Sequence, residues 1–157
     1  MPMSRRLRWY LDARGVKYEV LPHLRTQTSL QTARQAHIAP ERLAKSVLLE
    51  DEQGYLMAIL PASRRIELGR VERQLGRHME LATEPELVER FEDCQVGAVP
   101  ALGEAFGIRT LIDDSLLVAE DIYFEAGDHE DVVHVDGDSF RELMSDAMHG
   151  SFTQPLA

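Results

Sequence analysis

The sequence has little cysteine: Cys94 is the single one in a chain of 157 residues. One cysteine excludes a disulfide within the chain and a metal site built from several thiolates. Nothing in this cysteine usage contradicts a reducing compartment. We expect Cys94 to be a small, buried apolar side chain.

Long apolar runs are also missing. No segment reaches the roughly 18 consecutive apolar residues that a membrane helix needs. The arginine-rich start, residues 1–8, is not followed by the apolar stretch of a secretory signal. We therefore expect a cytoplasmic protein without a membrane partner. With 44% hydrophobic and 28% charged residues, residues 1–157 fit a single domain.

Positive charge is scarce, because 17 basic residues face 27 acidic ones and the net charge is −10. This balance argues against a protein that coats nucleic acid. Residues 1–90 nevertheless hold 15 basic and 12 acidic residues, whereas residues 91–157 hold 2 and 15. A polyanion should approach the first half, although solvated helix faces explain the charge alone more simply. The candidate contacts there are Arg5, Arg6, Arg8, Arg64, Arg65, Arg70, Arg73 and Arg77.

Several well-known catalytic motifs are absent as well. The chain has no GxSxG elbow, phosphate-binding P-loop or HExxH helix. A serine hydrolase, a nucleotide triphosphatase and a zinc protease are therefore disfavoured. The spacing of His23, His37 and His129 gives no metal signature, and we predict neither a metal nor a cofactor.

Strand and helix patterns alternate early in the chain, and strand patterns cluster late. The fold class predicted from this order is α/β or α+β, with a mixed, mostly antiparallel sheet flanked by helices. Residues 150–157 resemble a frayed tail. The expected helices cover residues 4–15, 28–36, 66–75 and 83–91, with a last one capped by Asp138 or Ser139. The expected strands cover residues 17–21, 46–50, 55–60, 78–82, 109–114, 121–126 and 131–136.

The hairpin expected within residues 43–60 begins with a lysine. "SVLLE" and "YLMAIL" are apolar runs, and "DEQG" between them supplies turn residues. Lys45 stands where the first strand enters the core, so its stem can pack on apolar neighbours while its ammonium attracts a phosphate or polarises a carbonyl. A lysine that protects a sheet edge from pairing is the alternative explanation.

The segment "CQVGAVPALG", residues 94–103, is predicted to be a shaped loop. Gly97 lets a ligand approach the main chain, and Pro100 stiffens the loop. The amides near Gly97 and Ala98 can donate to a carbonyl oxygen that gains negative charge during a reaction. A surface loop whose glycines only make turns explains the same pattern.

The third candidate is "EAGDHEDVVHV", which contains a turn between two expected strands. His129, beside Asp128, can act as an acid, a base or a hydrogen-bond donor to a substrate near neutral pH. A solvated turn is the commoner explanation of such a sequence. His134 lies within the alternating pattern and is most simply a strand residue.

In their order and spacing, six segments resemble the YbaK-like aminoacyl-tRNA deacylases, a family that includes the editing domain inserted in bacterial prolyl-tRNA synthetase. They are "LAKSVLL", "LMAILPASRRIEL", "LATEPEL", "CQVGAVPALGEAFGI", "LIDDSLL" and "IYFEAGDHEDVVHV". The resemblance runs from about Val20 to Leu143. It implies a mixed sheet with flanking helices and a pocket that takes the acceptor end of a mischarged tRNA and hydrolyses its aminoacyl ester.

The resemblance also implies roles for individual residues. Lys45 matches the lysine associated with activity in the family, and Gly97 with Pro100 matches its GxxP loop. His129 falls where the synthetase editing domain carries a pocket histidine. Many relatives have a second proline and a phenylalanine in the loop where this chain has "AL", which changes the wall of the pocket.

An aminoacyl ester is already activated, so such a site needs a positioned water and oxyanion donors rather than a strong nucleophile. The resemblance suggests that the neighbouring ribose hydroxyl of the substrate assists. We hypothesise that Lys45 anchors the terminal phosphate or the carbonyl, and that amides near Gly97 and Ala98 hold the oxyanion. Asp128 and His129 would orient the amino acid or the water.

Editing sites admit a small wrong amino acid and exclude a larger right one, because one methylene is worth only about 1–3 kcal/mol of discrimination. By resemblance, alanine on the proline tRNA is the leading substrate; serine, threonine and cysteine on other tRNAs stay open. We expect action in trans, with Arg64, Arg65 and Arg70 contacting the tRNA and a synthetase as a candidate partner. The alternative is a non-catalytic module of the same fold that binds aminoacyl-tRNA or a synthetase.

Overall fold

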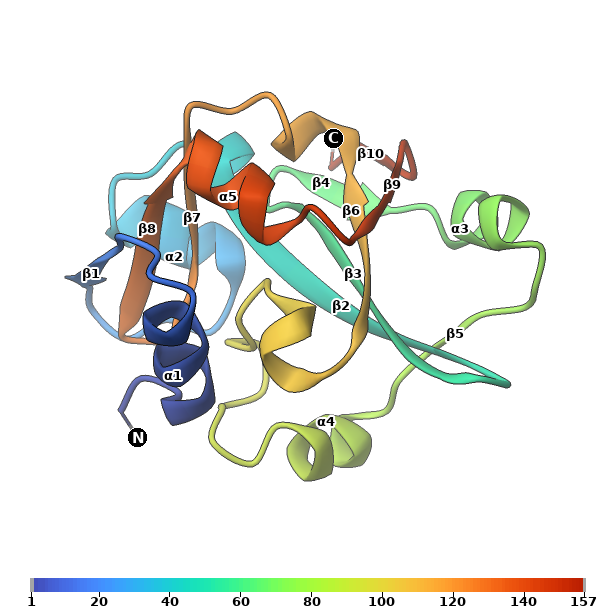
Figure 1. Cartoon of the computed structure of the whole chain (residues 1–157), viewed down its shortest axis with the longest axis horizontal. Helices are drawn as coiled ribbons and strands as arrows, with labels where there is room; N and C mark the ends of the chain where they lie inside the picture. The colour runs from blue at the N-terminus through green and yellow to red at the C-terminus, as the bar shows by residue number, and fades with distance from the viewer. Residues whose placement is uncertain (1, 157) are drawn as a thin grey trace.

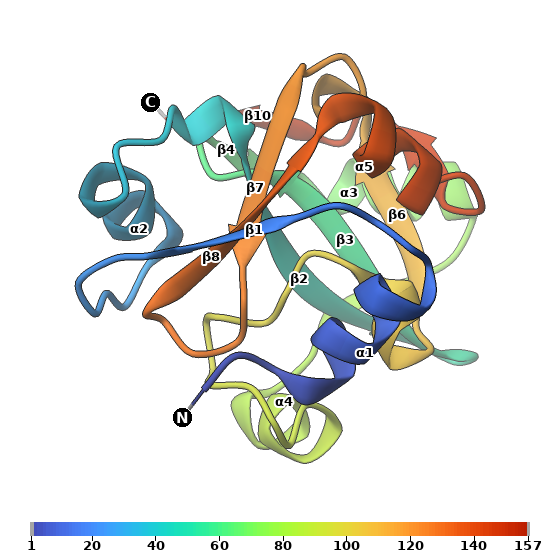
Figure 2. The same cartoon turned by 60° about the vertical axis from the view of Figure 1, so that its left-hand side comes forward.

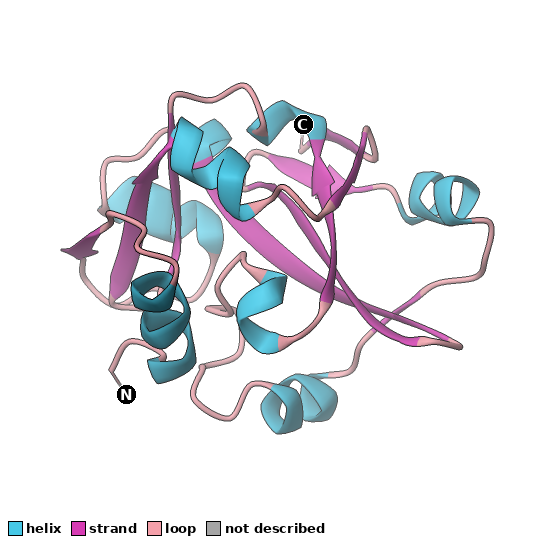
Figure 3. Ribbon diagram, viewed as in Figure 1, coloured by secondary structure: helices cyan, strands magenta, loops and turns pink. Residues whose placement is uncertain are grey.

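The computed structural model describes residues 2–156 (Figure 1). Strands occupy the middle of the molecule and helices lie around them (Figure 3). The helices are α1 (Arg5–Ala13), α2 (Ser29–Gln35), α3 (Leu68–Leu75), α4 (Glu84–Arg90) and α5 (Gly137–Leu143), with short 3₁₀ turns at Pro40–Arg42, Gly103–Phe106 and Asp114–Leu116. The strands are β1 (Glu19–Pro22), β2 (Leu43–Asp51), β3 (Gly54–Pro61), β4 (Arg64–Ile66), β5 (Glu80–Leu81), β6 (Arg109–Asp113), β7 (Asp121–Glu125), β8 (Asp131–Asp136), β9 (Met148–Gly150) and β10 (Thr153–Pro155).

The large sheet is mixed, which confirms the predicted fold class. Its strand order is β1-β8-β7-β2-β3-β6-β9. The short strand β5 also pairs with β2. Strand pairs β2/β7, β3/β6 and β6/β9 are parallel, and the other pairs are antiparallel. A separate two-stranded sheet joins β4 to β10.

Successive side chains of β3 point to opposite faces of the sheet, and different helices cover the two faces. Met57 and Ile59 pack into a core with α1 and α5, whereas Leu56, Ala58 and Leu60 pack with α3 on the opposite face. All five side chains are fully buried. Figures 1 and 2 agree that α1 and α5 lie on one side of the sheet and α2 on the other.

The hairpin of β2 and β3 is regular, but the other edge of β2 is interrupted. There β2 pairs with β7 only at Leu43 and Ala44, and with β5 only at Leu49 and Glu50. Within residues 2–156, positions 45–48 have no strand partner on that edge. The sheet therefore splits beside the middle of β2.

Most local predictions are confirmed. Ser4 caps α1 by accepting a hydrogen bond from the Leu7 N–H, and Thr28 caps α2. Thr83 and Glu86 form the predicted capping box of α4. The "DEQG" turn joins β2 to β3 as expected.

Three local predictions are wrong. Ile66 does not open a helix, because residues 64–66 pair with β10 and α3 begins at Leu68. Helix α5 is capped by Asp136 rather than by Asp138 or Ser139. The Asp136 side chain accepts a hydrogen bond from the Ser139 N–H at 2.7 Å. The C-terminal segment is not a frayed tail: it contributes β10 and the fully buried Phe152.

None of the helices in residues 2–156 is long and apolar enough to cross a membrane. Over the same range, no group of three or more His, Cys, Asp or Glu side chains is arranged to hold a metal ion.

Candidate active site

A cavity of about 360 Å³ opens where the sheet splits beside β2. This volume lies near the lower end of the roughly 300–1,000 Å³ that is typical of ligand pockets. Two larger hollows, of about 890 Å³ between α1 and α4 and about 760 Å³ near the β2–β3 turn, are lined by none of the predicted catalytic residues. The smaller cavity contains both Lys45 and Gly97, so we take it as the candidate site.

Lys45 reaches this cavity because of its place in the alternation of β2. Leu43 packs beneath α2, and Val47 packs against the core beneath α3, so the lysine between them lies at the gap between two apolar clusters. Lys45 is half-buried, and desolvation lowers its pKa below the ordinary 10.5. It lies on a central strand, and its ammonium forms no ion pair within residues 2–156.

The loop of residues 94–103 is held beside β2 by a side chain of that strand. The Ser46 hydroxyl donates to the Val99 carbonyl oxygen at 2.9 Å. Gly97 has a φ of +85°, a conformation that glycine adopts at little cost. The Ala98 N–H donates to the Gln95 carbonyl at 3.0 Å, whereas the Gly97 N–H has no acceptor among residues 2–156. The Gly97 amide is therefore free to donate to an oxyanion, whereas the Ala98 amide is already engaged.

His129 supports the loop from behind and does not line the cavity. Its Nε2 lies 2.7 Å from the carbonyl oxygen of Val96, and its side chain is buried. The φ of His129 is +60°, which is uncommon for a residue with a side chain. Its Nδ1 is buried without a hydrogen-bond partner within residues 2–156. This histidine thus fixes the position of Gly97 through its neighbour in the loop.

Asp128 and Pro100 also lie outside the cavity wall. The buried Asp128 carboxylate accepts the N–H groups of Glu130 and Asp131 at 3.0 and 2.9 Å, which closes the β7–β8 turn. Pro100 is buried, and its carbonyl accepts the Leu102 N–H at 2.8 Å. Both residues shape the segments that carry Gly97 and His129.

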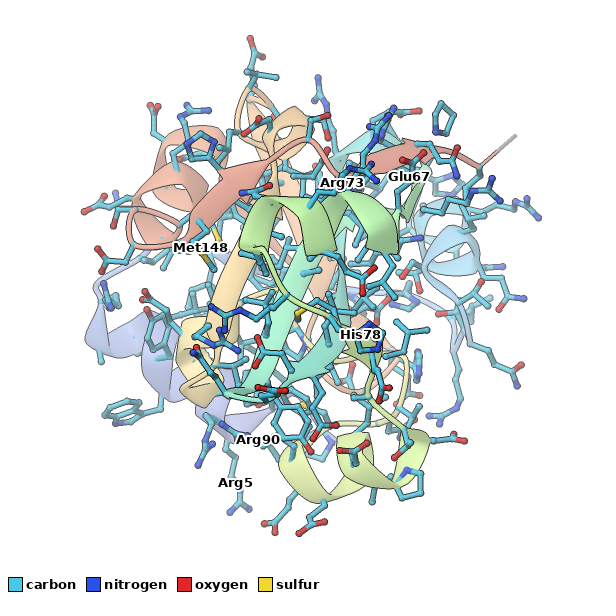
Figure 4. All side chains as sticks on the ribbon, turned by 90° about the vertical axis from the view of Figure 1, so that its right-hand side faces the viewer. Arg5, Glu67, Arg73, His78, Arg90 and Met148 are labelled. Atoms are coloured by element: carbon cyan, nitrogen blue, oxygen red, sulfur yellow. The ribbon has the colours of Figure 1, made fainter. Side chains whose placement is uncertain are left out.

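The predicted tRNA contacts gather on the small sheet of β4 and β10. Arg64 donates from Nε and Nη2 to the Thr153 hydroxyl and carbonyl, at 2.6 and 3.1 Å. Arg70 forms an ion pair with Glu67 at 2.6 Å, whereas Arg65 is exposed. Figure 4 shows the side of the molecule that carries α3. Glu67 and Arg73 mark the α3 region near the top of this view, and Arg5 and Arg90 lie near the bottom.

Among the cavity residues that the sequence did not single out are two with polar side chains on the strands, Ser46 and Glu125. Glu125 ends β7 next to a turn, so its sequence context is that of a solvated acid. In the structure it is 3% exposed. The parallel register pairs Leu43 with Tyr123 and Ala44 with Phe124, so Lys45 and Glu125 each follow the last residue of their strand in this pairing, and both line the cavity.

Cys94 is buried, as expected. Burial and the neighbouring Asp93 raise the pKa of its thiol. A thiol kept protonated is a poor nucleophile, so Cys94 has a packing role.

A mixed sheet that splits around a half-buried lysine, with a glycine loop held against the gap, defines an α/β protein with a small cavity at a break in its sheet. The sequence profile of the aminoacyl-tRNA editing domain family matches residues 23–143. The chain belongs to this family. No curated protein sequence matches the chain significantly.

Solved structures share this fold over nearly the whole chain. The crystal structure of "hypothetical protein APE2540" has a TM-score of 0.84 and 20% identity, covering 96% of this chain and 100% of that one. The structure of "a putative trans-editing enzyme for prolyl tRNA synthetase" has a TM-score of 0.82 and 22% identity, covering 98% of each chain. The structure of a scaffold protein used for epitope grafting has a TM-score of 0.81 and 19% identity, covering 99% of each chain. At these identities the matches establish the fold.

Proposed function

We propose that this chain is a trans-editing aminoacyl-tRNA deacylase that acts as a single domain in the cytoplasm. The observation that carries the proposal is the meeting of Lys45 and Gly97 in one small cavity. In the part of the chain that the structure describes, the Lys45 ammonium forms no ion pair and the Gly97 N–H has no acceptor. Membership of the editing domain family supports the same conclusion.

The chemistry needs few groups. Water adds to the ester carbonyl, the bond from the carbonyl carbon to the ribose oxygen breaks, and the ribose oxygen takes a proton. Lys45 would hold the terminal phosphate or the carbonyl oxygen, and the Gly97 N–H would donate to the oxyanion. His129 and Asp128 would keep the loop in place, while Ala98 and Pro100 would set the shape of the loop that binds the substrate.

Small amino acids suit the size of this cavity. A volume of about 360 Å³ has room for a short side chain and part of the terminal ribose. We propose alanine on the proline tRNA as the substrate, because the chain resembles proteins related to prolyl-tRNA synthetase. Arg64, Arg65 and Arg70 remain the proposed contacts to the tRNA, and a synthetase remains the proposed partner.

The test is to incubate the purified protein with a panel of mischarged tRNAs and to follow loss of the ester. We expect release of alanine from the proline tRNA, and a fall of at least about 100-fold in Lys45→Ala because a charged contact to the reacting group is lost. Lys17→Ala, at an exposed lysine, is the control. Full activity of Lys45→Ala would overturn the assignment, and stoichiometric binding without release would favour the non-catalytic module.

A further inference from the structure

The cavity contains a second charged side chain that the proposed reaction does not use. Glu125 lies at the end of β7 and is 3% exposed, and both of its carboxylate oxygens are buried without a hydrogen-bond partner within residues 2–156. A buried carboxylate without partners is costly, because its lost hydration is not replaced. Such a group is expected to find its partner in a ligand.

Nearby groups of the chain do not satisfy this carboxylate. The Thr32 hydroxyl on α2 lies close enough to lower the pKa of Glu125, but it is 2.6 Å from the Thr26 hydroxyl and donates to the Thr28 carbonyl at 3.1 Å. Lys45 lines the same cavity without reaching the Glu125 oxygens. The two opposite charges therefore border the cavity from adjacent strands without neutralising each other.

We propose that Glu125 binds the free α-ammonium group of the aminoacyl ester, which makes it a specificity-determining residue; this inference rests on the proposed function. An aminoacyl ester carries its positive amine one carbon away from the ester carbonyl. A carboxylate on β7 and an ammonium on β2 can engage these two ends at once, with the amine at Glu125 and the carbonyl or phosphate at Lys45. Because the amine binds at Glu125 and the carbonyl or phosphate at Lys45, these two side chains set the direction in which the substrate lies in the cavity.

The protonation behaviour of Glu125 is consistent with this role. Burial raises its pKa to about 7, with the Thr32 hydroxyl opposing the rise and the charges of Asp128 and Asp131 adding to it. Binding of a cation favours the ionised form and supplies the missing partner. The pocket would thereby favour an amine-bearing substrate over one whose amine is blocked.

A binding experiment tests this without requiring turnover. The probes are the alanyl amide of 3′-amino-3′-deoxyadenosine, which cannot be hydrolysed as an ester, and its N-acetyl derivative. Calorimetry on the wild-type protein should give about 10- to 100-fold tighter binding of the free amine, the range expected for one charge-assisted hydrogen bond. In Glu125→Gln the two probes should bind equally.

Two further variants keep the result interpretable. Glu125→Asp retains the charge and should retain part of the preference for the free amine. Glu130→Gln, at an exposed acid of the adjacent turn, should behave as wild type. Thermal melting establishes that each variant is folded.

The possible outcomes separate this inference from the proposed function. Deacylation with equal binding of the two probes, or a full amine preference in Glu125→Gln, overturns the role of Glu125 and leaves the deacylase intact. An amine preference that depends on Glu125 without any ester hydrolysis supports the role and overturns the deacylase. If the wild-type protein binds neither probe, the assignment of Glu125 is wrong.

Discussion

The imidazole of His129 packs against the α-carbon of Gly97. A β-carbon at position 97 would lie 3.2 Å from Cε1 and 3.3 Å from Nε2 of this ring, and 3.4 Å from the Gln27 carbonyl oxygen. Two segments that are 32 positions apart in sequence thus pack tightly against each other behind the cavity wall. Any side chain at position 97 must displace one of them.

Gly97→Ala is expected to reduce deacylation by about 10-fold or more, because the amide donor moves with the strained loop. The φ of +85° adds a stability cost of about 1–2 kcal/mol. Gly76→Ala is the matched control: Gly76 has a φ of +69° but open space around it, so it should show a similar loss of stability and full activity. Initial rates and urea denaturation measure both effects, and equal activity of the two variants would contradict the prediction.

Phe152→Ala is expected to lower the free energy of unfolding by about 3–5 kcal/mol, the usual cost of removing a buried phenylalanine. Phe152 is fully buried in the cluster with Val71 and Leu111, on the face of the sheet covered by α3. Urea denaturation checks the value. Leu156→Ala, at a side chain 41% exposed, should change stability by less than about 1 kcal/mol. A Phe152→Ala protein as stable as wild type would mean that the segment is a tail after all.

Stability should depend on pH through Glu125. Folding raises the pKa of this carboxyl from 4.5 to about 7 through desolvation, so between these values the folded state binds more protons than the unfolded state. The free energy of unfolding should therefore fall as pH rises through this window, by on the order of 3 kcal/mol. Glu125→Gln cannot ionise, so it should be more stable than wild type at pH 8.

Asp131 contributes a slope of the same sign, since its hydrogen bond with Asp128 and its burial raise its pKa to about 6. The wild-type protein and the Glu125→Gln variant both contain Asp131. The difference between their free energies of unfolding therefore isolates the contribution of Glu125. Urea denaturation at pH 5 and pH 8 measures this difference. If it is the same at the two pH values, the carboxyl is not desolvated in solution.

Arg64 and Arg65 of β4 should differ in how much they contribute to the stability of the protein. Arg65→Ala is expected to weaken tRNA binding and to reduce the slope of log affinity against log salt concentration by about 0.7–0.9, the effect of one phosphate contact. Arg64→Ala should in addition lower stability by about 1–2 kcal/mol, because it removes two hydrogen bonds to Thr153. Salt titrations of tRNA binding and urea denaturation distinguish the two. An unchanged salt slope in Arg65→Ala would remove this residue from the interface.

The sequence by itself determined the local structure and the position of the lysine. Capping residues such as Ser4 and Thr83 act on amides three positions away, so their effect is visible in a short window of sequence. The apolar runs around "DEQG" specify the hairpin for the same reason. Lys45 stood out because a charge interrupts an apolar pattern, and the order of motifs indicated the family.

Only the tertiary structure decided which residues share the cavity. The parallel pairing of β2 with β7 brings Glu125 and Lys45, 80 positions apart in sequence, to the same cavity, and no local pattern encodes a pairing of that range. The burial of Phe152 likewise depends on the partner strand β4 and on α3. Long-range pairing and burial arise from the packing of the whole chain, whereas caps and turns satisfy hydrogen bonds within a few residues.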